Sequence, residues 1–180
     1  MISQTELLKK ASHIKLLILD VDGVLTDGKL YFDAQGNEQK VFYVHDGLGM
    51  KLLQESGVKI AVISSRTSTT VTQRLQNLGV EYIYQGQENK HTAYHDLLNK
   101  VRLDPENIAY MGDDLPDLAI ICKVGLGIAV ANAVPLVKQY AFWHTEAKGG
   151  EGAVREVCEI ILQAQGKLEE MQARFLTTLK

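Results

Sequence analysis

Three features of the sequence predict an α/β fold with a doubly wound parallel sheet, Rossmann-like in type. Five apolar runs of strand length recur along the 180 residues, helical patterns separate them, and a glycine ends two of these patterns. Unalternated runs rich in Ile, Val and Leu are typical of strands that are buried on both faces. Because the length fits one hydrophobic core, we expect a single domain over residues 1–180.

The expected elements alternate in chain order, as parallel sheets require. The strands are predicted at 15–19, 58–63, 80–84, 107–111 and 127–130. Helices are predicted at 48–56, 67–78, 90–100, 115–123 and 152–166. We expect a short amphipathic helix without an apolar secretory segment within 1–15, and a helical or frayed tail over 167–180.

Residues 29–44 break this alternation. Two short strand patterns, 30–33 and 40–44, flank the turn-forming residues 34–37, which predicts a β-hairpin flap. The flap follows the first strand, so we expect it to lie over the carboxyl ends of the sheet. Tyr31, Phe42 and Tyr43 would then present an exposed face for contact with other flaps. The alternative is a flap that packs back on its own sheet.

Composition argues against several classes of partner. A net charge of −3, with 46% apolar and 23% charged residues, indicates an ordinary globular protein and no general affinity for nucleic acid or anionic membranes. The apolar runs are shorter than the roughly 20 residues of a membrane helix. Cys122 and Cys158 form no CxxC pair, so we expect buried free thiols in a reducing, cytoplasmic compartment, with a disulfide as the alternative.

Polar side chains follow four successive predicted strands, and parallel strands place their carboxyl ends at one edge of the sheet, where ligands bind. The residues expected at this edge are Asp20, Asp22, Ser64, Ser65, Arg66, Lys90, Asp113 and Asp114. Each has a structural alternative, because Asp and Ser also cap helices and a lone Lys is usually solvated. Their occurrence in order after four strands favours a functional site.

These groups suit phosphoryl transfer. Asp20 and Asp113, with a backbone carbonyl, could hold Mg²⁺, which prefers oxygen ligands and relieves the repulsion between carboxylates. Asp20 could then attack phosphorus, and Asp22 could protonate the leaving oxygen and later activate water. Ser64 can donate to a phosphoryl oxygen, and Lys90 can balance its charge.

The same residues carry a family resemblance. The segment DVDGVLTDG, the hydroxyl of Ser64, Lys90 and the segment GDDLPD resemble, in order, the four motifs of the haloacid dehalogenase superfamily. The resemblance implies Asp20 as nucleophile and Asp22 as general acid/base. It also implies Mg²⁺ held by Asp20, Asp113 and the main-chain carbonyl of Asp22, with Asp117 and Asp114 around these ligands.

Further segments, HDGLGMK, YQGQENK and GGEGAVREV, resemble a branch of this superfamily without a large cap domain. This branch implies a phosphorylated eight-carbon sugar acid of lipopolysaccharide synthesis as substrate. It also implies a homotetramer whose flaps pack together and in which a neighbouring subunit closes each site. A nine-carbon, sialic-acid-type phosphate is the alternative substrate.

Several residues are candidates for contact with the sugar acid. The resemblance implies that His45, Asp46, Gly47, Leu48 and Gly49 line the substrate pocket. From the residues alone, these glycines fit either the approach of backbone amides to an anion or a tight turn into a helix.

Arg66 and Arg74 could pair with a carboxylate, and Arg66 lies at the expected working edge. The glycine-rich run 149–152 should approach the site, with Arg155 nearby. The family pattern has glycine where this chain has Ser65, and the extra Cβ could alter the turn.

Three other interpretations are disfavoured. A receiver-type phospho-acceptor module also uses Asp, Ser or Thr, and Lys, but it lacks an acid two residues after the acceptor, as Asp22 is here. A catalytically silent structural subunit would not need all of these acids. His91 and His95 have the spacing of two zinc ligands, but no third ligand is evident, so we expect ordinary surface histidines.

Overall fold

The computed structural model describes residues 2–176 and contains the predicted parallel sheet. Six strands pair in the order β5-β4-β1-β6-β7-β8, and every pair is parallel. The strands are β1 (Leu16–Leu19), β4 (Lys59–Ile63), β5 (Tyr82–Tyr84), β6 (Ile108–Gly112), β7 (Leu126–Ala129) and β8 (Trp143–His144). Five of them confirm the predicted strands to within two residues at each end. The edge strand β8 was not predicted, because two residues leave no periodic pattern.

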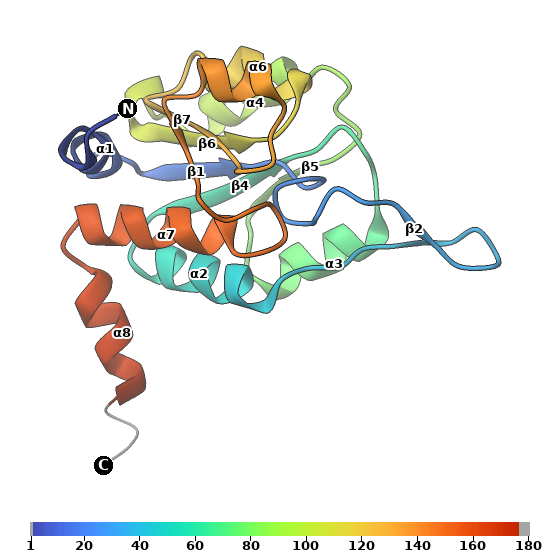
Figure 1. Ribbon diagram of the computed structural model, residues 1–180, viewed down its shortest axis with the longest axis horizontal. Coiled ribbons are helices and arrows are strands. Elements are labelled where there is room, and N and C mark those ends of the chain that lie inside the picture. Colours follow the sequence, from blue (N-terminus) through green and yellow to red (C-terminus); the bar gives the residue numbers. More distant parts are fainter. Residues whose placement is uncertain (1, 177–180) are drawn as a thin grey trace.

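Helices cover both faces of the sheet (Figure 1). One layer holds α2 (Val44–Glu55), α3 (Thr69–Asn77) and α7 (Ala153–Ala164). The other holds α4 (Lys90–Val101), α5 (Leu118–Ile121) and α6 (Pro135–Tyr140). The N-terminal α1 (Gln4–Ala11) packs against α7, and α8 (Leu168–Leu176) extends away from the body. Single 3-10 turns precede β6 (Pro105–Asn107) and α5 (Leu115–Asp117).

The core lies between the sheet and these two layers. All four residues of β1 are fully buried, as expected for a central strand with helices on both faces. The buried stripe of α7, which includes Val154, Val157 and Ile161, packs against α2. Burying each such side chain contributes about 1.5–3 kcal/mol to the stability of the fold. This core therefore holds the strands, and with them the carboxyl edge of the sheet, in place.

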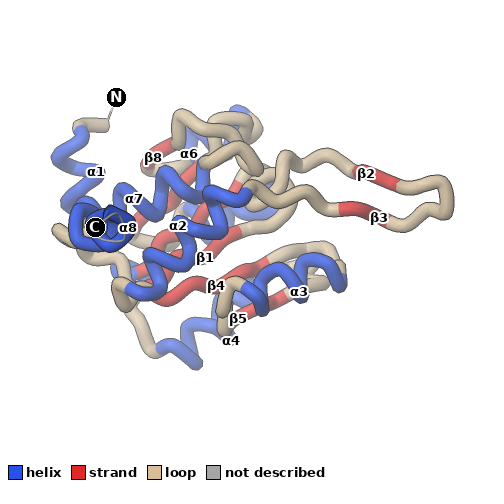
Figure 2. Tube along the Cα trace, turned by 90° about the horizontal axis from the view of Figure 1, so that it is seen from below, coloured by secondary structure: helices blue, strands red, loops and turns tan. Residues whose placement is uncertain are grey.

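The flap forms a separate two-stranded sheet that projects from the body (Figure 2). Its strands, β2 (Tyr31–Phe32) and β3 (Glu38–Gln39), are shorter than predicted. The carboxylate of Asp33 accepts hydrogen bonds from the backbone N–H groups of Gln35 (2.9 Å) and Asn37 (2.8 Å), which closes the turn early and sets the register. The strands of the flap therefore do not pack back on the sheet (Figure 2), but Phe42, which was predicted on the exposed face, packs against the core.

Several local predictions were wrong. Helix α2 begins at Val44 rather than at residue 48, and α6 was not predicted because it spans only six residues. Cys122 is exposed rather than buried, since it caps the C-terminus of the short α5, whereas Cys158 is buried as expected. The predicted tail is helical up to residue 176, and positions 177–180 lie outside the described residues. Within residues 2–176, no helix combines the length and the apolar character that crossing a membrane requires.

Candidate active site

The predicted polar residues meet in one cleft at the carboxyl edge of the sheet. Its volume is about 250 Å³. The cleft is lined by Asp20, Asp22, Gly28, Ser64, Ser65, Arg66, Lys90, Asp113, Asp114, Pro116 and Asp117. Four strands, β1, β4, β5 and β6, lead into the segments that carry these side chains, as the topology of a parallel sheet requires.

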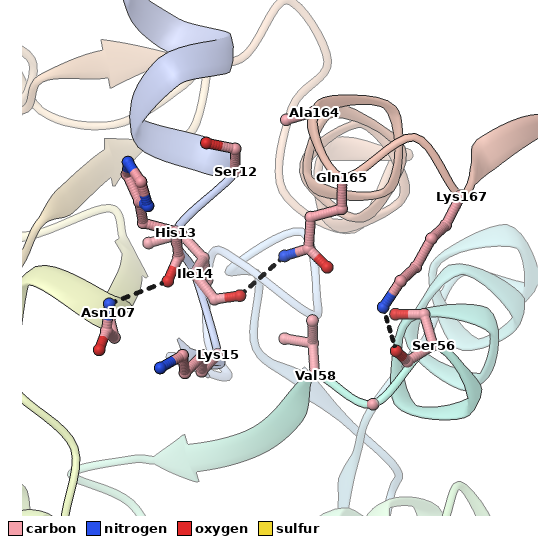
Figure 3. A pocket seen from close by; sticks show the side chains of 11 residues that line it. Ser12, His13, Ile14, Lys15, Ser56, Val58, Asn107, Ala164, Gln165 and Lys167 are labelled. Carbon is pink, nitrogen blue, oxygen red and sulfur yellow. Dashed lines mark hydrogen bonds between the residues drawn. The ribbon is translucent and has the colours of Figure 1, made fainter.

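A larger cavity of about 550 Å³ lies at the opposite, amino edge (Figure 3). Two of its polar side chains are paired within the chain: Gln165 donates to the carbonyl of Ile14 (2.8 Å) and Lys167 to that of Ser56 (2.6 Å). No aspartate or glutamate lines it. The smaller, acidic cleft is therefore the candidate active site.

Asp20 follows β1 directly and is 7% exposed. Its Oδ1 accepts a hydrogen bond from the backbone N–H of Val21 (2.7 Å) and lies 2.7 Å from the ammonium of Lys90. Lys90 begins α4, and its side chain is only 2% exposed. The two residues therefore form a buried ion pair that lines the cleft.

Asp117 organises the loop after β6. Its Oδ1 accepts hydrogen bonds from Lys90 (2.8 Å) and from the hydroxyl of Tyr110 (2.7 Å), and its Oδ2 from the backbone N–H groups of Asp113 (3.0 Å) and Asp114 (3.2 Å). Its side chain is completely buried. Asp117 thus fixes both the lysine and the loop.

The acids of the cleft carry the electrostatic signature of a cation site. Asp20, Asp113 and Asp117 each bring one oxygen within 4.8 Å of the others. Burial and the charge of Asp117 raise the pKa of Asp20 to about 7, against the opposing effect of Lys90. Burial and the charge of Asp20 raise the pKa of Asp113 to about 7. A divalent cation would relieve this repulsion, and carboxylate oxygens suit Mg²⁺.

Asp20 and Asp113 fit the role of metal ligands better than Asp117. Both oxygens of Asp117 are engaged by four donors, whereas, within residues 2–176, neither Oδ2 of Asp20 nor the carboxylate of Asp113 accepts a hydrogen bond. The predicted third ligand, the main-chain carbonyl of Asp22, stays a prediction.

Two glycine segments let the loops approach one another closely. A Cβ on Gly23, whose φ is +89°, would stand 2.1 Å from Oδ2 of Asp113, and one on Gly149 would stand 1.7 Å from the carbonyl oxygen of Gly23. Glycine is therefore required at both positions. The predicted approach of the run 149–152 to the site is confirmed by this packing.

Ser64 follows β4 and is 3% exposed. Its hydroxyl oxygen accepts a hydrogen bond from the backbone N–H of Arg66 (3.3 Å), and its own proton can be donated to a phosphoryl oxygen. The backbone at position 65 does not require the glycine of the family pattern. Among residues 2–176, Arg102 is the one non-glycine residue with positive φ, so the backbone at Ser65 accommodates a side chain without strain.

Asp22 belongs to a ring of four alternating charges, which we call the ion-pair ring (Asp22, Lys40, Glu38 and Arg66). Asp22 pairs with Lys40, Lys40 lies 3.3 Å from Glu38, and Arg66 donates to Glu38 at 2.6 Å. Nε of Arg66 closes the ring 3.8 Å from Oδ2 of Asp22. Arg66 therefore lines the cleft as predicted, with its guanidinium held by a residue of the flap.

The other predicted substrate contacts lie outside the cleft of their own chain. His45 and Leu48 are exposed on α2, whereas Asp46, Gly47 and Gly49 are buried against other helices. Asp46 accepts a hydrogen bond from the backbone N–H of Arg155 (2.8 Å).

The two glycines of this segment serve helix packing. A Cβ on Gly49 would stand 3.1 Å from the Cα of Arg155, and one on Gly47 would stand 2.3 Å from Nη2 of Arg74. The guanidinium of Arg74 lies 6.0 Å from the ring centre of Phe42, and neither residue lines the cleft. Because α2 begins at Val44, both glycines lie within the helix and not in a tight turn before it.

Sequence reasoning missed three residues of the site: Lys40, Glu38 and Tyr110. Lys40 follows its partner Asp22 by eighteen residues, and a contact over that separation leaves no local sequence pattern. The hairpin pattern alone could therefore not reveal the roles of Lys40 and Glu38. Tyr110 did leave a weak signal, since a hydroxyl within a continuous apolar strand must find a buried partner. His91 and His95 contact each other (3.1 Å between Nε2 atoms), and no acid joins them in a metal-binding group within the described chain.

Comparisons with known proteins relate this chain to one group of hydrolases. Residues 81–157 match the model of the haloacid dehalogenase-like hydrolase family. The chain is 48% identical to the 3-deoxy-D-manno-octulosonate 8-phosphate phosphatase of Salmonella typhi over 170 residues, which cover 94% of this chain and 90% of the relative.

Two solved structures have the same fold. The phosphatase of that name from Moraxella catarrhalis, solved with a magnesium ion, a phosphate ion and a KDO molecule, is 43% identical, with a TM-score of 0.93 over 96% of this chain and 99% of that one. The cobalt-bound phosphatase from Haemophilus influenzae is 42% identical, with a TM-score of 0.86 over 89% and 94% of the two chains.

Proposed function

We propose the function of this chain from one premise, that it belongs to the 3-deoxy-D-manno-octulosonate 8-phosphate phosphatase family of haloacid dehalogenase-like hydrolases. The chain is a Mg²⁺-dependent phosphatase that hydrolyses 3-deoxy-D-manno-octulosonate 8-phosphate to the free sugar acid and inorganic phosphate. One observation carries this conclusion: Asp20, Asp22, Ser64, Lys90 and Asp113 line a single cleft in a member of this family. The free sugar acid is a precursor of lipopolysaccharide.

The reaction follows from the positions of two acids. A carboxylate oxygen of Asp20 attacks phosphorus, and the bond from phosphorus to the sugar oxygen breaks as Asp22 donates a proton to that oxygen. An aspartyl phosphate on Asp20 and the free sugar acid result. Asp22 then takes a proton from the water that attacks phosphorus, which releases inorganic phosphate and restores both carboxyl groups.

Three further groups stabilise the charge that develops on the phosphoryl oxygens. Ser64 donates a hydrogen bond from its hydroxyl, and the buried ammonium of Lys90 stands beside Asp20. Asp20, Asp113 and the main-chain carbonyl of Asp22 would hold Mg²⁺, which supplies positive charge to both the nucleophile and the phosphate. The raised pKa values of Asp20 and Asp113 support this assignment.

Recognition of the sugar carboxylate belongs to the same proposal, with Arg66 as its partner. Arg66 lines the cleft and is half-exposed, whereas Arg74 contacts Phe42 away from it. We expect Arg66→Ala to raise KM for the sugar acid phosphate and Arg74→Ala to leave KM near that of the wild type. Contacts of residues 45–49 with substrate remain predictions, since in one copy these residues do not line the cleft.

A homotetramer, with each site completed by a neighbouring subunit, is the proposed assembly. Large apolar side chains stand exposed on the flap and the adjoining start of α2: Leu30 (51%), Phe32 (59%), Val41 (60%) and Val44 (74%). A two-stranded hairpin is marginal alone, so packing of flaps from several copies would stabilise it. Tyr31 and Tyr43 share this exposure, but Phe42 packs against the core instead.

Analytical ultracentrifugation tests this assembly. The wild type should sediment as a tetramer, and Phe32→Ser should sediment as a smaller species with reduced activity. A wild-type monomer with full activity would contradict the proposed assembly. A cytoplasmic location is part of the same proposal and is supported by the unpaired thiols of Cys122 and Cys158.

Phosphate release from a panel of sugar phosphates, with Mg²⁺ and then with chelator, tests the proposed function. The eight-carbon acid 8-phosphate should be the best substrate, and chelation should abolish turnover. Preference for a nine-carbon acid 9-phosphate would replace the proposed substrate, and turnover that resists chelation would overturn the proposed metal.

A further inference from the structure

We propose that Lys40, on the flap, is a positioning residue that holds Asp22 in the orientation needed for proton transfer to and from the substrate. The inference rests on the proposed function, since the acid/base role of Asp22 belongs to it. Lys40 lies outside the predicted motifs and does not line the cleft, so it would act through Asp22 and not by contact with phosphorus.

The burial of Lys40 is the first observation. Its side chain is only 2% exposed, although it follows directly after the short strand β3 of a projecting hairpin. A buried ammonium is costly unless it is paired, and Lys40 is paired with two carboxylates, those of Asp22 and Glu38. The fold therefore directs this lysine inward, toward the acid of the cleft, whereas Lys29 at the start of the flap is exposed.

The geometry of the ion-pair ring is the second observation. Oδ1 of Asp22 is held by Lys40, and Oδ2 lies 3.8 Å from Nε of Arg66, so cations approach both oxygens. The Asp22 side chain is still 22% exposed and lines the cleft. A carboxylate on a loop has two freely rotating torsions, and proton transfer requires its oxygen within hydrogen-bond reach of the leaving group. Lys40 supplies the fixed contact that Asp22 needs.

The ring also separates two possible roles of Lys40. Glu38 forms ion pairs with Lys40 and Arg66 and, within residues 2–176, neither an ion pair nor a hydrogen bond with Asp22, so it serves as the matched control. Glu38 and Lys40 both belong to the flap, and each ties it to the body by an ion pair, Glu38 to Arg66 and Lys40 to Asp22. A lysine that only anchors the flap would share that role with Glu38, and removing either residue would have the same effect. A lysine that positions Asp22 would have an effect of its own, confined to reactions that need the acid.

The test uses two substrates in parallel, the sugar acid 8-phosphate and p-nitrophenyl phosphate, whose leaving group needs no proton. Lys40→Met should lower kcat for the sugar phosphate at least about tenfold, a part of the roughly 10²–10⁴-fold that general acid–base catalysis contributes. It should lower kcat for the aryl phosphate less than about threefold, since that reaction bypasses the acid. Lys40→Arg should restore most of the loss, and Glu38→Gln should leave the ratio of the two kcat values as in the wild type.

Equal losses on both substrates, or the same change of ratio in Glu38→Gln, would overturn the proposal. Asp22 and Glu38 are partly exposed and can be hydrated, so the protein should fold without the lysine. Lys40→Gln provides the same comparison should the methionine variant fail to fold. The wild type tests the proposed function separately, because that function fails if the wild type does not hydrolyse the eight-carbon substrate. The ratio of the sugar phosphate kcat to the aryl phosphate kcat is then measured with the sugar phosphate that the wild type does hydrolyse.

Discussion

Replacing Lys90 by methionine would leave two buried carboxylates without their shared cation. The ammonium lies 2.7 Å from Oδ1 of Asp20 and 2.8 Å from Oδ1 of Asp117, and its side chain is 2% exposed. Removing one partner of a buried ion pair costs about 3–5 kcal/mol, because the remaining charge is neither hydrated nor paired. Protonation of Asp20, whose pKa is already about 7, offers partial relief, so the lower end of this range applies at neutral pH.

Urea unfolding with chelator present measures this cost. Lys90→Met should lose about 3 kcal/mol of unfolding free energy at neutral pH, and more at higher pH, where Asp20 cannot stay protonated. The control is the double variant Lys90→Met with Asp20→Asn, which should recover part of the loss because one unpaired charge is gone. A variant within about 0.5 kcal/mol of the wild type, which is the ordinary effect of a surface substitution, would refute this account of the buried pair.

Three further predictions concern the acids of the cleft. Without metal, the pKa values of Asp20 and Asp113 lie near 7 in the folded protein and near 4 in the unfolded chain, so the folded form binds more protons between these values. The unfolding free energy, measured by urea titration in chelator, should therefore fall as pH rises from about 4 to about 7. Saturating Mg²⁺ should remove this dependence on pH. An unfolding free energy that rises with pH in chelator would contradict the raised pKa values. Gly23→Ala should lower the unfolding free energy by about 1–3 kcal/mol, because it forces a side chain into a positive-φ position beside Asp113. It should also abolish the increase in Tm on adding Mg²⁺. An unchanged increase in Tm would be inconsistent with a metal at Asp113. Asp22→Ala should slow sugar phosphate hydrolysis about 10²–10⁴-fold and that of an aryl phosphate much less, whereas equal losses in steady-state assays would argue against the acid role.

The meeting of these residues in one cleft could be predicted because their positions follow from the sheet. Asp20, Ser64 and Asp113 come directly after strands, and the carboxyl ends of parallel strands share one edge, so strand prediction alone brings them together. Lys90 was predicted for the same reason, although its burial and its second partner, Asp117, were not. These contacts depend on how α4 and the loop after β6 pack, which local patterns do not encode.

The flap and the start of α2 were harder to predict. The inward direction of Lys40 depends on the path by which the hairpin returns to the body, and Phe42 packs against the core only because the chain turns into α2 at Val44. Glycines at 47 and 49 fit both the approach of backbone amides to an anion and a tight turn into a helix, and neither pattern indicates that the helix begins before them. Side chains of α3 and α7 lie against these glycines within α2, which is a long-range contact that the local pattern does not encode.

Trapping of the covalent intermediate tests the central claim most directly. The wild type is mixed with substrate and Mg²⁺, quenched in acid and reduced with borohydride, which converts an aspartyl phosphate to homoserine, and the peptides are then analysed by mass spectrometry. We expect homoserine at position 20 in the wild type and none at that position in Asp20→Asn, which should also release no phosphate. Homoserine at another acid, or full turnover by Asp20→Asn, would contradict the assignment of Asp20 as the nucleophile.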